Sequence, residues 1–176
     1  SPGRRVPSPH AGCGKEGPPP LVDAGPPPAP VAPPPPRVTP ISELMTRLDI
    51  DPRVRLAEEL APPDDPSRIA VLQFFDGFVR GDATGVGEML SDPDRLELER
   101  LQESGMWEPV IEQITRCDVR CGDTRDGKVA LAVFHVGRNF QAQLWTYELS
   151  PSPQFFAEPM PPNIVDRLRG EDWIAA

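Results

Sequence analysis

The sequence predicts an α+β domain, in which three helices precede and pack on a curved antiparallel sheet, behind a disordered proline-rich tail. Of the 26 prolines, 15 lie in residues 1–40, whereas every aromatic residue lies at or after Phe74. Apolar residues follow helical spacing over 69–102 and alternate with polar residues beyond Trp107. A run of helices followed by a run of strands favours an α+β plan over alternating βαβ units.

Residues 1–38 form the predicted tail. Consecutive prolines have no amide donors, so they favour an extended polyproline II spacer over helix or sheet. Residues 39–64 are predicted as a short helical neck, with one amphipathic helix at 41–48 and a second short stretch at 56–60. The neck has no aromatic residue, which predicts a small contribution to the core. The α+β domain is then expected to span 65–176.

Asp-Pro pairs punctuate the middle of the chain, at 51–52, 65–66 and 92–93. In each pair the aspartate can cap a helix, and proline fits the first turn, where its missing N–H is not needed. These pairs therefore predict helix starts.

Three helices are expected to open the domain. The first carries a broad apolar face and ends at Gly81, and the second covers 82–90. The third covers 93–102, and we expect Leu96 and Leu101 to face the core.

Beyond these helices, the side-chain period of two predicts strands joined by turns. The expected strands are 116–121, 129–136, 140–149 and 155–158, and a last helix is expected at 164–169.

The predicted strand at 129–136 is apolar on both faces. Helices on one side of the sheet can cover only one of these faces. The other face is therefore expected to be covered by a second copy of the chain, as a homodimer, or by the neck.

The stretch at 71–83 reads Val-Leu-Gln-Phe-Phe-Asp-Gly-Phe-Val-Arg-Gly-Asp-Ala. It resembles the opening helix and the following Gly-Asp turn of the nuclear-transport-factor-two-like superfamily, which includes SnoaL-like proteins and ketosteroid isomerases. The resemblance covers about 67–162. It implies a cone-shaped, cystatin-like fold with a pocket at its open end. Some members are isomerases or cyclases, many bind ligands or partners without known catalysis, and dimers are common.

Enzymes with this fold use a pocket carboxylate or histidine as base and a tyrosine or acid as donor. The resemblance thus implies His135 or Asp76 as a base and Tyr147 as the donor. Each also has a structural interpretation, as a hydrogen-bonded strand residue or a solvated helix residue. Asp118, between two arginines, is expected to be a surface charge.

Trp145 and Tyr147 share a strand face with Gln143, by the period of two. Together with Trp107, this amphipathic row suits a pocket wall or a dimer surface. The favoured function is a non-catalytic module that binds a small ligand or a protein partner on a proline-rich tether. The alternative is a small pocket enzyme of isomerase or hydrolase type.

The tail carries one more signal. Ala11-Gly12-Cys13 resembles the end of a bacterial lipoprotein signal, which implies lipidation of Cys13 and attachment to the cell envelope. Otherwise Cys13 is an ordinary thiol and the chain is expected in the cytoplasm.

Charge and composition argue against several classes of protein. Residues 41–176 carry 14 basic and 25 acidic residues, which disfavours nucleic-acid binding. Apolar runs fall far short of the roughly 20 residues that span a bilayer. Cys117 and Cys121 are too far apart along one strand for a disulfide. The chain's two histidines, His10 and His135, form no paired ligand spacing, so we expect no metal or cofactor.

Overall fold

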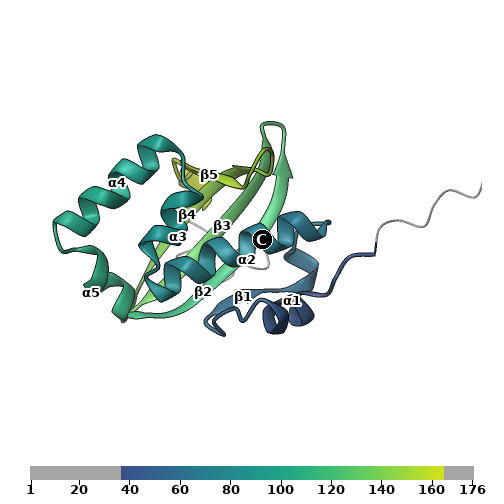
Figure 1. The fold of residues 1–176 in the computed structure, drawn as a ribbon, viewed down its shortest axis with the longest axis horizontal. Coiled ribbons are helices and arrows are strands. Elements are labelled where there is room, and N and C mark those ends of the chain that lie inside the picture. Colours follow the sequence, from purple (N-terminus) through teal and green to yellow (C-terminus); the bar gives the residue numbers. More distant parts are fainter. Residues whose placement is uncertain (1–36, 165–176) are drawn as a thin grey trace, which may run out of the picture. The chain divides into compact units, whose positions relative to one another are not determined.

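A five-stranded mixed sheet organises residues 37–164, the part of the chain that the computed structural model describes (Figure 1). The strands lie in the order β1-β2-β3-β4-β5, and only β1 runs parallel to its neighbour. The α+β class and the mainly antiparallel sheet are therefore confirmed. The predicted tail, Cys13 and nearly all of the predicted helix at 164–169 lie outside the described residues.

Strands β2 to β5 form an antiparallel meander. Gly127, directly after the turn between β2 and β3, has a φ of 126° that favours glycine, and Gly137 at φ 60° lies in the turn between β3 and β4. The strand bounds are Ile114–Thr124 (β2), Gly127–Val136 (β3), Asn139–Glu148 (β4) and Gln154–Glu158 (β5).

Residues 39–64 differ from the predicted helical neck. Helix α1 (Ile41–Arg47) is present, but β1 (Val54–Leu56) takes the place of the second helix and is followed by the 3₁₀ turn η3 (Glu58–Leu60). Val54 and Leu56 are buried in the main core. The helix prediction at Leu56 is wrong because backbone pairing with β2 decides the conformation of this short apolar segment.

Helix α2 (Asp65–Arg80) crosses one face of the sheet (Figure 1). Asp64, the residue before the predicted Asp65, caps it by accepting a 2.8 Å hydrogen bond from the Ser67 N–H. Gly81 ends it in the left-handed conformation, at φ 72°. The end at Gly81 is confirmed, and the capping residue is corrected by one position.

Three short helices follow α2, namely α3 (Ala83–Glu88), α4 (Asp92–Glu103) and α5 (Trp107–Glu112). Leu98 is the buried residue of α4, whereas Leu96 is 54% exposed and Leu101 37% exposed. The prediction that these two leucines face the core is wrong because α4 packs chiefly on α3 and α5, and Leu98 is the residue that it buries. Helix α5 was not predicted.

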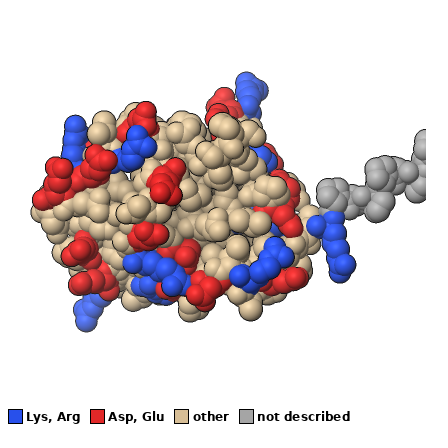
Figure 2. All heavy atoms as spheres, in the orientation of Figure 1, with Lys and Arg blue, Asp and Glu red and all other residues tan. Residues whose placement is uncertain are grey.

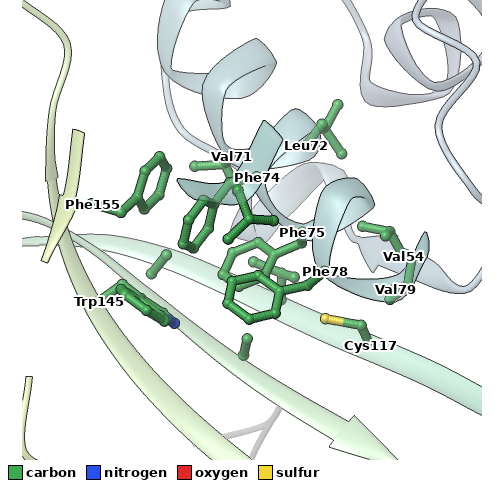
Figure 3. Packing of buried hydrophobic residues seen from close by; sticks show 14 of the residues in the cluster. Val54, Val71, Leu72, Phe74, Phe75, Phe78, Val79, Cys117, Trp145 and Phe155 are labelled. Carbon is green, nitrogen blue, oxygen red and sulfur yellow. The ribbon is translucent and has the colours of Figure 1, made fainter. Parts of the chain in front are cut away.

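The core lies between α2 and the covered face of the sheet (Figure 3). Phe74 of α2 is fully buried and stacks on Phe155 of β5, with ring centroids 3.9 Å apart. It also makes edge contacts with Phe78 and Trp145. Phe74 therefore joins the helix layer to the far strand of the sheet.

Arg68 fastens the N-terminal residues to α2. Its guanidinium is buried and donates to the carbonyl of Pro62 at 2.7 Å and that of Thr39 at 2.8 Å. It also pairs with the carboxylate of Glu58 at 2.8 Å. One side chain thus holds both ends of the segment that contains α1 and β1.

Asp51 makes the stability of this segment depend on pH. Hydrogen bonds from the Arg53 side chain lower the pKa of Asp51 to about 2. The stabilisation is complete above about pH 4 and is lost as the pH falls towards 2, because protonation breaks these bonds. We expect the urea midpoint to fall more steeply between pH 4 and pH 2 in the natural chain than in Asp51→Asn. Glu59→Gln, at an exposed position, is the control and should keep the pH dependence of the natural chain. The prediction is contradicted if the urea midpoint falls equally steeply in the natural chain and in Asp51→Asn.

The opposite face of the sheet has a smaller apolar cluster. Val133 is buried there, and Leu131, Ala142 and Ile164 pack against it. Residues 161–164 therefore cover part of the face for which a dimer was predicted, and the dimer itself stays a prediction. Within 37–164, no helix is long and apolar enough to cross a bilayer.

Candidate functional site

A hollow of about 340 Å³ lies between α4, α5 and the sheet at β4. Three of the four predicted ligand-binding residues line it, namely Trp107 of α5 with Gln143 and Trp145 of β4. The structure therefore brings these three together. Apolar side chains complete most of the lining, chiefly Phe78, Leu90, Leu98, Leu101 and Met160.

The floor of the hollow is aromatic. The Phe78 ring packs against both indoles, with its centroid 5.7 Å from that of Trp107 and 5.9 Å from that of Trp145. Both tryptophans are buried. Since these rings are held by the core on their other sides, the apolar surface exists before any ligand arrives.

The tryptophan and glutamine residues that line the hollow also carry N–H hydrogen-bond donors. The Trp145 indole N–H donates to Gln143 Oε1 at 3.0 Å, which fixes the Gln143 amide and turns its NH₂ group elsewhere. Within the described residues, neither this NH₂ group nor the Trp107 indole N–H has a hydrogen-bond acceptor. Both groups belong to residues that line the hollow, so they can donate to a carbonyl or hydroxyl oxygen of a ligand that reaches them.

Three carboxylates and no cation line the hollow, and one of the three, that of Glu97, pairs with Arg100 at 3.4 Å. Asp94, Glu97 and Glu158 belong to its lining. The stretch 92–112, which holds α4 and α5, has seven acidic and two basic residues. Figure 2 shows acidic side chains at this end of the described unit, with basic side chains among them. The site is therefore apolar inside and negative at its rim.

Asp94 also links two elements of the fold at this rim by hydrogen bonds. Its Oδ2 accepts from the Ser91 hydroxyl at 2.6 Å and from the backbone N–H of Ala157 at 2.9 Å. The carboxylate thus ties α4 to β5 and fixes the wall of the hollow.

Tyr147, the fourth predicted ligand-binding residue, lies elsewhere. It is buried and stacks on Phe155 at 5.1 Å, and burial raises the pKa of its phenol. Tyr147 lines other, separate hollows, one of them beside Pro62 and Lys128.

His135 lies on the opposite face of the sheet, in an ionic cluster. Its Nε2 is 3.0 Å from Asp118 Oδ2, and Arg116 Nε donates to the same oxygen at 2.9 Å. Asp118 is only 6% exposed, so the prediction of a surface charge is wrong. Its burial is compensated by these two partners from β2 and β3.

Asp76 has structural partners on α2 and beyond. Its Oδ1 accepts from Arg80 Nε and from the backbone N–H of Asp51, both at 2.7 Å. None of five hollows found among the described residues is lined by two of Asp76, His135 and Tyr147. The predicted bases and the predicted donor are therefore not brought together.

Several lining residues were missed in the sequence. Leu101 was assigned to the core, and Asp94 and Met160 carry no motif. The surplus of acidic residues at 92–112 is the one signal in the sequence that points to this hollow.

No family model, curated protein or solved structure matches the chain. The resemblance to the nuclear-transport-factor-two-like superfamily stays a prediction, and the function is argued from the site.

Proposed function

We propose that the chain is a non-catalytic binding module on a proline-rich tether, and that it holds the apolar group of a small ligand or protein partner beside Trp107 and Trp145. The observation that carries this is the aromatic hollow with unpaired N–H donors. The proposal includes the cone-shaped architecture of the resemblance, with its pocket at the open end.

The acidic rim selects the ligand's charge. Three carboxylates line the hollow, so a cationic group attached to an apolar body gains attraction and an anionic group is repelled. In the alternative enzyme, Asp76 or His135 would be the base and Tyr147 the donor. These residues lie in separate places, so no observation favours an isomerase or hydrolase at this site.

Two probes that share an apolar body test the proposal. 4-Phenylbutylamine and 4-phenylbutyrate have similar phenylalkyl bodies, but one ends in an ammonium group and the other in a carboxylate group. We expect the amine to bind the whole chain with Kd in the millimolar range, about five-fold or more tightly than the carboxylate at low salt. Calorimetric titration measures both, and added salt should reduce the difference.

Two leucines of α4 provide matched variants. Leu101 lines the hollow and Leu96 does not, although both are exposed enough to be truncated without unfolding the chain. Leu101→Ala should weaken amine binding about five-fold, and Leu96→Ala should leave it unchanged. Absence of amine binding, or equal effects of the two variants, would contradict the proposed function.

A further inference from the structure

Strand β4 has a segment that only one neighbour covers. β5 pairs with β4 from Glu148 to Leu144 and stops at Glu158. Prolines follow at 159, 161 and 162, and because proline has no N–H it cannot continue the ladder. Within residues 37–164, residues 139–143 of β4 pair with β3 on one side and with no strand on the other.

The outer edge of β5 is protected in a different way. The Phe155 N–H donates to the Met89 carbonyl at 2.7 Å, and the Phe155 carbonyl accepts from the Ser91 N–H at 3.1 Å. Asp94 accepts from the next outward N–H, that of Ala157. The link between α3 and α4 therefore occupies the backbone groups of β5 that face away from β4.

Among the described residues, no backbone group protects residues 139–143 in this way. Free edges of natural sheets are usually blocked by charges, prolines or covering segments. This segment reads Asn-Phe-Gln-Ala-Gln, with no charge and no proline, and Phe140 is 47% exposed. No described backbone group outside the strands bonds to it. An added strand would find its backbone partners here.

The same segment forms one wall of the hollow. Ala142 and Gln143 line it together with Trp107 and Trp145. Side chains of a strand alternate between its two faces, so an added strand would direct one side chain of each pair towards the aromatic floor. Gln143 and Trp107, whose N–H donors have no acceptor within the described residues, line the same hollow.

We propose that the partner is an extended basic peptide that adds as a strand to residues 139–143, beyond the end of β5, and places one apolar side chain in the hollow. This inference rests on the proposed function and specifies its ligand. The acidic stretch 92–112 and Glu158 supply the charge complementarity for lysine or arginine beside the apolar anchor.

The test is selection of random dodecapeptides, displayed on phage, against the whole chain, with counter-selection on Leu101→Ala. We expect selected peptides to combine lysine or arginine with apolar residues at alternate positions. In synthetic copies, N-methylation of every second amide should weaken binding about five-fold or more at each site, because those amides face β4, and the intervening ones should matter little. Amides within 139–143 should exchange about ten-fold more slowly in the complex.

The outcomes separate this inference from the proposed function. Uniform effects of N-methylation or unchanged exchange at 139–143 would overturn strand addition, and selected peptides without basic residues would overturn the basic partner. If no peptide is enriched while 4-phenylbutylamine still binds, the inference fails and the proposed function stands. If neither peptide nor amine binds, both fail.

Discussion

Phe74→Ala is expected to lower the free energy of unfolding by about 3–5 kcal/mol, because a fully buried ring would be replaced by a cavity. The ring contacts Phe155, Phe78 and Trp145, from three different elements. These neighbours are held by other contacts, so they can close the cavity only in part. Urea unfolding followed by circular dichroism measures the change.

Gln73→Ala is the matched control for Phe74→Ala. Gln73 precedes Phe74 on α2 and is exposed, so its truncation should change stability by less than about 0.5 kcal/mol. Similar losses in the two variants would contradict the packing described for α2.

Arg68→Met is expected to lower the free energy of unfolding by about 2–4 kcal/mol. Methionine fills the buried space but leaves the carbonyls of Thr39 and Pro62 without their donors. The loss should be local at first, so hydrogen exchange in α1 should accelerate more than exchange in α2. Urea unfolding and hydrogen exchange measured by mass spectrometry test the two parts.

Glu58→Gln shows which partner of Arg68 matters. The Glu58 side chain is 53% exposed, and exposed ion pairs contribute about 1 kcal/mol or less. We therefore expect a small effect from Glu58→Gln and a large one from Arg68→Met. A large effect of both, or unchanged exchange in α1 of Arg68→Met, would refute the assignment to the backbone carbonyls.

Local signals made much of the fold predictable. The apolar face of α2 and the glycine at its end act within one helix, so the sequence places this helix well. The β1 segment has only three residues, and its conformation depends on β2, which is distant in the sequence. In α4, Leu96, Leu98 and Leu101 fit more than one helical face, and contacts with α3 and α5 decide which is buried.

For the candidate site, the alternation of side chains along a strand predicts which residues of that strand share a face, and nothing beyond it. Parity put Gln143 and Trp145 on one face, and both line the hollow. The position of Trp107 depends on α5, a helix of six residues whose weak periodicity gave no signal. The partnership of His135 with Asp118 depends on the register between β2 and β3, which single-strand patterns do not contain.

The parallel pairing of β1 with β2 has a consequence for synthesis on the ribosome. Val54 lies opposite Cys117, about sixty positions later in the chain. At about 5–20 residues per second, the nascent chain waits roughly 3–12 s after Val54 is made before its partner exists. During this interval Val54 and Leu56 are apolar groups without a sheet to join. The order of translation therefore makes this segment a place where a chaperone can act on the emerging polypeptide.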